Sequence, residues 1–158
     1  MFGMRQSAPL DRFRIVCTGL LIERGHVLLV QEAKAIAKGL YNLPAGKLEP
    51  HETIQSGVKR EVWEETGLRV RLVKLIGIYE RVIGKQGNHL VNFVFLVKRV
   101  SGRLRPSAEH PDVRFFSLQE IPRLQRRGLL RTLPIRAAIA DWRRGQSTST
   151  RFVKQLLP

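Results

Sequence analysis

The sequence predicts a single α/β domain. Three observations support this expectation: a length of 158 residues, two pairs of neighbouring segments rich in strand-forming residues, and two segments with helical periodicity. A chain of this length can build one full hydrophobic core but has little room for a second. Hydrophobic residues make up 43% of the chain and charged residues 26%, and both values are typical of globular proteins. We therefore expect a domain that folds on its own.

The first pair of strands is expected at residues 13–23 and 27–31. Apolar and polar side chains alternate in the first segment, and the residues between the two segments, which include Gly25, favour a hairpin turn. A polar connection at residues 33–50 follows. Two antiparallel strands should therefore open the fold.

The best-marked helix is expected at residues 53–66, because Gly67 stands where a C-terminal cap belongs. Two further segments, residues 69–83 and 89–100, are rich in Val, Ile, Leu, Phe and Tyr. Turn-forming residues separate them. These segments predict a second, longer hairpin.

The last third of the chain predicts a short strand at residues 113–117, a short helix at 118–125 and a final helix at 134–144. The final helix has apolar residues at positions i, i+3, i+4 and i+7, which should pack on the sheet. They are Ile135, Ala138, Ile139 and Trp142.

The domain is expected to span residues 13–144. Residues 1–12 are then an N-terminal extension. Residues 145–158 form a C-terminal tail, whose first part has the composition of a linker, so we assign no structure to it.

Cysteine usage and hydropathy argue against a disulfide framework, a Cys-based zinc site and a membrane span. Cys17 is the single cysteine and lies in an apolar run, where a buried thiol is expected. The longest aliphatic or aromatic run, residues 93–97, is far shorter than the roughly 20 residues of a membrane helix. Residues 1–14 lack an apolar signal core. We expect a cytoplasmic location and no membrane partner.

The charge balance points to anionic partners. The chain has 28 Lys and Arg against 13 Asp and Glu, which gives a net charge of +15. Residues 99–151 hold 12 Arg and only four acidic residues. Arginine makes two-pronged contacts with phosphate, so nucleotides and nucleic acid are both candidates. A merely solvated basic face is the alternative. We expect this stretch to supply nonspecific affinity for nucleic acid and no chemistry.

The predicted helix at residues 53–66 carries acidic residues where an apolar face belongs. Its apolar stripe consists of Ile54, Val58 and Val62. Three carboxylates fall on or beside that stripe, in the last two turns: Glu61, Glu64 and Glu65. The negative end of the helix dipole disfavours them there, and Glu61 and Glu65 are a like-charge pair at i and i+4.

This arrangement predicts a bound cation. Clustered carboxylates are hard oxygen ligands, which suit Mg²⁺ or Mn²⁺ better than zinc. The alternative is a structural network of salt bridges in which Lys59 and Arg60 neutralise part of the charge.

A motif joins these residues to an upstream loop. Gly46, five residues, Glu52, seven residues and Arg60-Glu61-Val62-Trp63-Glu64-Glu65-Thr66-Gly67-Leu68 match every fixed position of the Nudix box. The preceding Tyr41-Asn42-Leu43-Pro44-Ala45-Gly46 resembles the family's lead-in, with Tyr and Ala at positions that are commonly Trp and Gly. Residues 115–122 also resemble Nudix domains, so the similarity covers residues 13–144. It implies an α/β/α sandwich with a mixed sheet.

The resemblance also implies a metal site. Glu64 and Glu65 match the principal metal ligands of the family, and Glu61 matches a residue that binds metal or orients the attacking water. The carbonyl oxygen of Ala45 matches a backbone metal ligand. Three further positions match supporting residues: Arg60, which braces the acidic cluster, and Glu52 and Gly46 beside it.

Other candidates lie outside the box. Glu109 stands in a loop where several family members place a metal ligand or general base, although an exposed loop Glu is the alternative. Tyr41 matches an aromatic residue that stacks on a base in some relatives, or it simply packs under its loop. Three cations near strand ends or in the lead-in loop are candidate phosphate contacts: Arg14, Lys38 and Arg81. The four histidines are expected to be ordinary polar residues.

The implied function is a Mg²⁺-dependent phosphohydrolase, with Mn²⁺ as a second possible ion, that cleaves nucleoside di- or triphosphates or a related small pyrophosphate. The box is most similar to MutT-like relatives that act broadly on nucleotides and on pyrimidine pyrophosphates. One alternative is an ADP-ribose or nucleotide-sugar pyrophosphatase. Another is a module that binds RNA or processes its 5′ end with the Arg-rich last third. The oligomeric state stays open.

Overall fold

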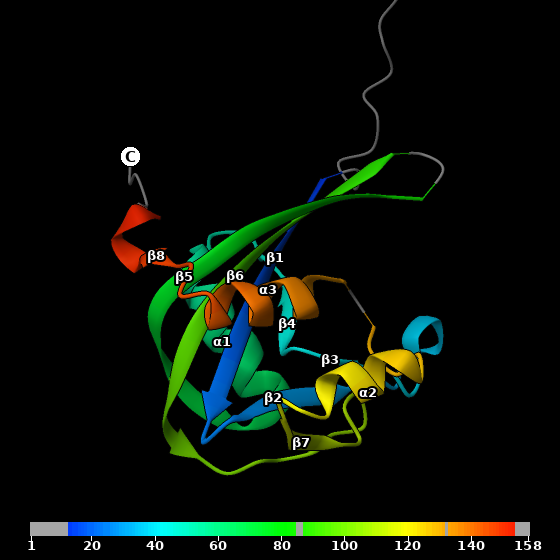
Figure 1. The fold of residues 1–158 in the computed structure, drawn as a ribbon. Coiled ribbons are helices and arrows are strands. Elements are labelled where there is room, and N and C mark those ends of the chain that lie inside the picture. Colours follow the sequence, from blue (N-terminus) through cyan, green and yellow to red (C-terminus); the bar gives the residue numbers. More distant parts are fainter. Residues whose placement is uncertain (1–12, 85–86, 132, 154–158) are drawn as a thin grey trace, which may run out of the picture.

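The computed structural model describes residues 13–84, 87–131 and 133–153 (Figure 1). Over these residues, eight strands form one sheet. Its main order is β3-β2-β1-β6-β5-β8, with β4 paired to β1 and β7 paired to β2. The sheet is mixed because β1 (Phe13–Glu23) runs parallel to β6 (Asn88–Gly102), whereas β5 (Leu68–Ile83) runs antiparallel to β6. Both predicted hairpins are thus present.

The first hairpin joins β1 to β2 (His26–Gln31) through Arg24 and Gly25. Both turn residues have positive φ, 48° and 76°, which is the conformation of the tight turns that match strand twist. On its other edge, β2 pairs with β7 (Val113–Ser117), whose bounds agree with the prediction.

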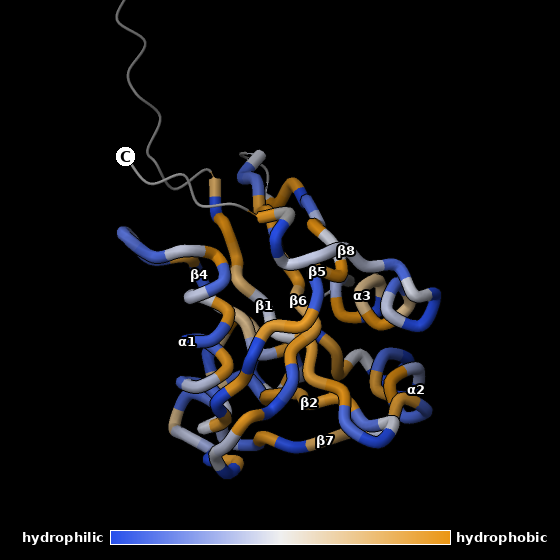
Figure 2. Tube along the Cα trace, turned by 90° about the vertical axis from the view of Figure 1, so that its left-hand side faces the viewer, coloured by the Kyte–Doolittle hydropathy of each residue, from blue (hydrophilic) through white to orange (hydrophobic). Residues whose placement is uncertain are grey.

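Helices cover both faces of the sheet (Figure 2). Helix α1 (Ile54–Thr66) lies on one face. Helices α2 (Ile121–Arg126) and α3 (Leu133–Arg143) lie on the other. Each interface has its own apolar cluster, one around Val58, Val62 and Phe95, the other around Leu20, Ile76 and Ile139. The expected α/β architecture is confirmed.

The close approach of α1 to the sheet depends on a glycine of β1. A Cβ at Gly19 would lie 2.4 Å from a methyl carbon of Val62, so a side chain there would push the helix away. Cys17 lies under the same helix and is fully buried, as expected. Burial, followed by the charge of Glu52, raises the pKa of the Cys17 thiol to about 12. The thiol therefore stays protonated.

Capping fixes both ends of α1. The Thr53 hydroxyl accepts a hydrogen bond from the Ser56 N–H at 3.0 Å and so satisfies a free donor of the first turn. At the other end, Gly67 has φ of 78° and donates its N–H to the Trp63 carbonyl at 2.8 Å. Gly67 is thus the predicted cap.

The connection at residues 33–50 contains structure that the sequence pattern does not indicate. It holds the 3₁₀-helix η2 (Ala35–Ala37) and the strands β3 (Tyr41–Asn42) and β4 (Ala45–Lys47). Strands of two or three residues are too short for an alternating pattern, and neighbouring strands determine where they form.

The bounds of α2 and α3 differ from the prediction. Helix α2 begins at Ile121 rather than at 118, because Pro122 favours the first turn and residues 118–120 form a turn. In that turn, the Glu120 carboxylate accepts the Ser117 N–H at 2.7 Å. Helix α3 begins and ends one residue earlier than expected.

The segment after α3 belongs to the packed structure. Strand β8 (Thr148–Ser149) pairs with β5, and the 3₁₀-helix η3 (Thr150–Phe152) follows it. The predicted domain end at residue 144 therefore leaves out a stretch that extends the sheet. The expected N-terminal extension, residues 1–12, lies outside the described residues. No helix in the described part of the chain is long and apolar enough to cross a membrane.

Candidate functional site

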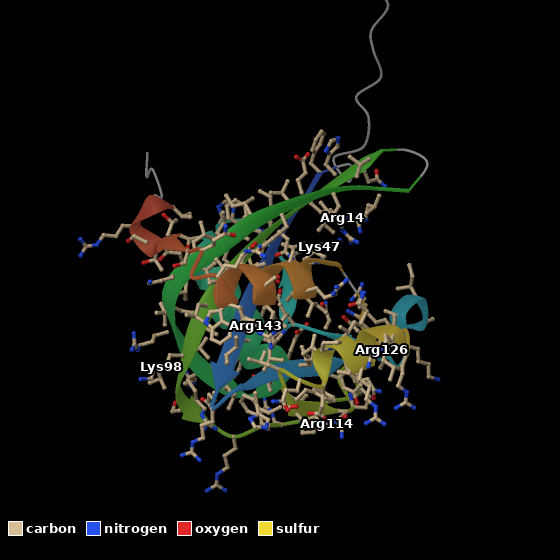
Figure 3. The ribbon with its side chains drawn as sticks, viewed as in Figure 1. Arg14, Lys47, Lys98, Arg114, Arg126 and Arg143 are labelled. Atoms are coloured by element: carbon tan, nitrogen blue, oxygen red, sulfur yellow. The ribbon has the colours of Figure 1, made fainter. Side chains whose placement is uncertain are left out.

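A cavity of about 680 Å³ opens between α1, the sheet and the loop before β7. Among the described residues, its lining carries charges of both signs. The acidic residues are Glu32, Glu61, Glu64, Glu65 and Glu109. The basic residues are Arg14, Lys34, Lys47, Arg81 and Arg131. Figure 3 shows Arg14 on β1 and Lys47 on the neighbouring β4. The cavity therefore offers places for a cation and for anionic groups.

Arg60 connects the acidic face of α1 to the loop before the helix. Its guanidinium donates from Nε and Nη2 to the two oxygens of Glu52, at 2.8 and 2.9 Å. It also donates to the Lys47 carbonyl at 3.0 Å, to Glu61 at 2.7 Å and to Glu64 at 3.1 Å. Hydrogen bonding from Arg60 lowers the pKa of Glu52 despite its partial burial. Arg60 thus contacts both the acidic residues of α1 and the loop before the helix, as expected for a residue that braces the acidic cluster.

Glu61 lies directly against the backbone of Gly46. A Cβ at Gly46 would fall 2.0 Å from a Glu61 carboxylate oxygen, so only glycine leaves room for that carboxylate. Glu61 is 8% exposed. Its burial raises the pKa of the carboxyl group, and the hydrogen bond and charge of Arg60 oppose that shift.

Glu65 is the most perturbed of the three helical carboxylates. Burial raises its pKa to about 9, and the nearby charges of Glu61 and Glu32 add to the shift. The Ala45 N–H opposes it by donating to Glu65 at 2.9 Å. On its other oxygen, Glu65 faces the His110 Nε2 at 3.4 Å. Ala45 lies in the cavity lining, and the contact that it makes with the acidic cluster is through its N–H.

The donor set fits a hard divalent cation. Within the described ranges, no three His, Cys, Asp or Glu side chains are already arranged around one point, because Glu61 and Glu64 face Arg60 and Glu65 is held by Ala45. The helix nevertheless brings three carboxylates together, and the Arg60 guanidinium contacts two of them, Glu61 and Glu64. The pKa of Glu65 is raised first by burial and then by the negative charges of Glu61 and Glu32, which the charge of Lys34 offsets only in part. Oxygen ligands of this kind suit Mg²⁺ or Mn²⁺.

Arg14 and Arg81 lie on the part of the sheet that lines the cavity. Both are paired in register with Leu90 of β6, one from each side, so they form one row across three strands. Their Nε atoms are buried and have no hydrogen-bond partner among the residues that the structure describes. A buried guanidinium N–H without an acceptor is costly, so this row is suited to an anionic ligand.

Glu109 also lines the cavity, from the loop before β7. Its side chain is 66% exposed and forms an ion pair with Lys34 at 3.2 Å. It therefore differs from the buried Glu61, which the rigid helix holds in place.

Comparison with known protein families identifies the family of this chain. The NUDIX domain family model matches residues 12–134, well over half of the chain. This chain belongs to the Nudix family. It is therefore a Nudix hydrolase, an enzyme that acts on pyrophosphate bonds.

Three known proteins illustrate the similarity. The ADP-ribose pyrophosphatase of Methanocaldococcus jannaschii is 29% identical over 136 residues, which are 78% of this chain and 80% of that protein. The 8-oxo-dGDP phosphatase of Homo sapiens is 42% identical over 95 residues, 60% of this chain but 28% of that protein. A solved NUDIX hydrolase structure from Nitrosomonas europaea has a TM-score of 0.83 at 27% identity and covers 90% of this chain and 97% of that one. The expected Nudix fold is confirmed.

Two candidate substrate contacts lie outside the cavity of this Nudix domain. Tyr41 is 5% exposed and packs edge-on against Phe116. Its hydroxyl donates to Asp112 at 2.5 Å and accepts from Arg114 at 3.0 Å. Burial, followed by the hydrogen bond to Asp112, raises the pKa of Tyr41. The ring is therefore a packed one, which is the alternative to base stacking.

Lys38 is the second such residue. It is exposed just after η2 and does not line the cavity, whereas Lys34, just before η2, does. The two lysines lie at opposite ends of η2, so only one of them reaches the cavity. Both are close to the lead-in loop in the sequence, and the sequence alone therefore does not show which one it is.

The Nudix box pattern gives no indication of several residues at the cavity. Glu32 is 5% exposed and forms an ion pair with Arg131, which is 99 positions away. His110 is buried beside Glu65, and burial lowers its pKa. Asn92 accepts a hydrogen bond from the Thr18 hydroxyl at 2.7 Å. An acidic residue directly after the end of β2 was a usable signal for Glu32, but nothing local indicates Arg131.

Proposed function

We propose that this Nudix hydrolase is a Mg²⁺-dependent phosphohydrolase, with Mn²⁺ as a second usable ion, that cleaves nucleoside di- or triphosphates or a related small pyrophosphate. Water attacks phosphorus in this reaction. The observation that carries the proposal is one cavity that combines the carboxylates of α1 with the unpaired guanidinium row of Arg14 and Arg81. A diphosphate needs both features, because its anionic oxygens must be neutralised along their whole length.

The box residues would hold the ion. Glu64 and Glu65 are the main ligands, with Glu61 and the Ala45 carbonyl as further candidates. When bound, a divalent cation neutralises phosphate oxygens and makes an attacking water more acidic. Arg60 keeps Glu52, Glu61 and Glu64 in place through its five donated hydrogen bonds, which include the one to Lys47.

The sheet would bind the rest of the substrate. Arg14 and Arg81 supply donors whose Nε–H groups need an acceptor, and a phosphate oxygen satisfies such groups in a charge-assisted hydrogen bond. The names of the Methanocaldococcus jannaschii and human relatives, ADP-ribose pyrophosphatase and 8-oxo-dGDP phosphatase, each refer to a substrate in which a diphosphate is joined to a nucleoside.

An ADP-ribose pyrophosphatase is the second candidate. The relative with that name matches 80% of its own length, a larger share than the 28% of the 8-oxo-dGDP phosphatase. A panel with Mg²⁺ separates these functions: nucleoside di- and triphosphates, ADP-ribose, dinucleoside polyphosphates and capped RNA, each measured by the released phosphorylated product.

Metal ligation is tested by Glu64→Gln and Glu65→Gln. Each substitution keeps the shape of the side chain and removes its ligand charge, so we expect turnover to fall strongly while the fold is kept. The control is Glu80→Gln, because Glu80 is an exposed carboxylate of β5 that contacts His89. Normal turnover in both Glu variants, with normal melting curves, would eliminate the metal-site proposal.

The water-activating role is tested by Glu61→Gln and Glu109→Gln. Glu61 is fixed on α1, whereas Glu109 is exposed on a loop, and a rigidly held group is the better preorganised base. We expect Glu61→Gln to lower kcat by roughly 10²- to 10⁴-fold at saturating Mg²⁺. The loss in Glu109→Gln should be at least partly restored by more Mg²⁺. Rescue of Glu61→Gln, together with a Glu109→Gln defect that no Mg²⁺ concentration restores, would move the base to the loop.

A further inference from the structure

The strands β1, β5 and β6 extend past α1 at one end of the sheet (Figure 1). Four large apolar side chains of these strand ends are between 39% and 71% exposed, and they are Phe13, Ile15, Ile78 and Val82. Seven large apolar side chains are exposed in the described part of the chain, so more than half of them lie in this one region. Apolar residues that gather in one place on a surface mark an interaction site, whereas single ones do not.

Register places these side chains on one face of the sheet. Three rows cross β5, β6 and β1 here, and their members are Val82, His89 and Phe13; Glu80, Val91 and Ile15; and Ile78, Phe93 and Cys17. Side chains of residues that are opposite in register point to the same face. Cys17 and Phe93 pack in the apolar cluster under α1, so the other rows continue the face that α1 covers. We call this exposed surface the distal face and define it by its apolar members: Phe13, Ile15, Ile78, Val82 and Val91.

The opposite face of the same strand ends lines the cavity. Arg14 lies between Phe13 and Ile15 in β1, and Arg81 precedes Val82 in β5. Because side chains alternate along a strand, both arginines point away from the distal face, to the side on which they line the cavity. Whatever covers the distal face therefore also supports the strand ends that carry the two arginines.

The distal face has no cation, although the chain has a net charge of +15. None of the residues in its three rows is Lys or Arg. Its charged and polar residues contact each other, since the Glu80 carboxylate lies 2.9 Å from Nδ1 of His89, and the His89 ring stacks on Phe13 at 5.0 Å. Nucleic acid and anionic membranes need cations on the protein, so the distal face suits neither. Its partner must offer another apolar surface.

A second copy of this chain supplies such a surface, and the area is sufficient. The four exposed side chains present on the order of 400 Å² of apolar surface, since an aromatic side chain alone buries about 150 to 250 Å². Stable interfaces bury about 800 Å² on each partner, with an apolar core inside a polar rim. The distal face is large enough to form that core when two copies pack about a two-fold axis. Two copies with a charge of +15 repel each other, and a face without cations limits that repulsion.

We propose that two copies of this chain associate through the distal face, and that this contact holds the strand ends of Arg14 and Arg81 where they bind an anionic substrate. The first part stands on the exposed apolar side chains alone. The second part rests on the proposed hydrolase function, because it gives the dimer a role in substrate binding at the same site. The acidic residues belong to α1, another element, so association should act on substrate binding rather than on the chemical step.

Sedimentation equilibrium measures the association directly. We expect a particle of twice the 18.1 kDa chain mass at micromolar concentration. Val82→Glu places a charge in the distal face and should raise the dissociation constant at least about tenfold, the effect of losing one well-buried interface side chain. The matched control is Val100→Glu, because Val100 is about as exposed, 64% against 61%, but lies at the opposite end of the β5–β6 hairpin.

Salt distinguishes an apolar contact from an ionic one. Added salt screens the repulsion between two positively charged copies, so the wild-type dimer should become tighter as the ionic strength rises. An interface built on ion pairs would weaken instead. Phe13→Ser, which removes the most exposed side chain of the distal face without adding a charge, should weaken the dimer at every salt concentration.

Steady-state kinetics with a small nucleotide test the second part. Dilution of the wild type below its dissociation constant, and Val82→Glu at the same dilution, should raise KM by about fivefold or more and leave kcat nearly unchanged. Linkage requires the reverse effect as well. A nucleotide with a methylene group in place of the bridging oxygen, which is not hydrolysed, should tighten the dimer by the same factor. A merely structural defect would lower kcat and the melting temperature together.

Three results would overturn the proposal. One is a wild type that stays monomeric at every protein and salt concentration, which would leave the distal face to a different occupant. Another is an equal weakening of the dimer by Val82→Glu and Val100→Glu, which would place the interface elsewhere. The third is an unchanged KM in the dissociated enzyme, which would remove the role of the dimer in substrate binding. A dimer that depends on Val82, in an enzyme that turns over no small pyrophosphate, would instead reject the proposed function and keep the interface.

Discussion

Ionising Glu65 in the folded protein is unfavourable, because its carboxyl group is buried beside other carboxylates. Its pKa is raised to about 9 in the folded, metal-free protein, from an ordinary value of 4.5. Between these two pH values the folded state keeps a proton that the unfolded state has lost. The stability that this proton supports is therefore full below pH 4.5 and falls as the pH rises toward 9.

A pH series in EDTA tests this consequence. The melting temperature of the metal-free wild type should decline from about pH 5 to pH 9, and Glu65→Gln, which has no proton to lose, should flatten the decline. Added Mg²⁺ should raise the wild-type melting temperature most at the alkaline end, because the ion competes with the proton for the carboxylate. A Glu65→Gln profile parallel to that of the wild type would contradict the assignment.

The same residues show which part of the site a sequence can predict. Glu61, Glu64 and Glu65 are three and four positions apart on one helix, so helix geometry alone brings them to one face. The Glu32–Arg131 ion pair joins residues 99 positions apart and depends on the tertiary fold. For Tyr41 the sequence leaves base stacking and packing both open, because nothing near β3 in the sequence indicates its contacts with Phe116 and Asp112.

Among the elements, α1 and the loop before it act as one unit because Arg60 joins them. The guanidinium holds Glu52 with two hydrogen bonds and the Lys47 carbonyl with a third. Lysine keeps the charge but cannot reproduce this fork. We expect Arg60→Lys to lower the free energy of unfolding by about 1 to 3 kcal/mol, as unmade buried hydrogen bonds do, and to reduce turnover by releasing Glu61 and Glu64. Chemical denaturation and steady-state kinetics measure the two effects.

The control for Arg60→Lys is Arg99→Lys. Arg99 pairs with Glu23 at 2.9 Å, but both side chains are substantially exposed, 43% and 30%. Such pairs contribute about 1 kcal/mol or less, so this variant should be close to the wild type in stability and activity. Equal behaviour of the two Lys variants would mean that Arg60 is only another surface charge.

The long elements were predictable because each carries its own signal. The hairpin of β5 and β6, the capped helix α1 and the strand β7 all appear within one or two residues of their expected positions. The short strands β3, β4 and β8 depend on pairing with β2, β1 and β5. Two or three residues cannot show a period, so the partner strand, not the local sequence, determines them.

For the whole molecule, the segment after α3 decides where the folded unit ends. Beyond the pairing of Lys74 and Leu75 with β8, the Gln55 side chain of α1 donates to the carbonyls of Thr150 and Val153, at 3.1 and 3.2 Å. Val153 also packs against the apolar cluster under α1. The segment thus ties an outer strand to the first turn of the helix that carries the acidic site.

Truncation tests this role of the segment. A chain that ends at Arg144 loses the pairing of β8 with β5, the two Gln55 hydrogen bonds and the partial burial of Val153, so its free energy of unfolding should fall by at least about 2 to 4 kcal/mol. The melting temperature should drop by roughly 5 to 15 °C.

A chain that ends at Val153 keeps all of these contacts and is the matched control, while Gln55→Ala isolates the two hydrogen bonds. None of residues 145–153 lines the cavity, so turnover per folded molecule should survive the truncation below its melting temperature. Equal melting of the two truncated chains would show that the domain ends at α3, as the sequence alone predicts.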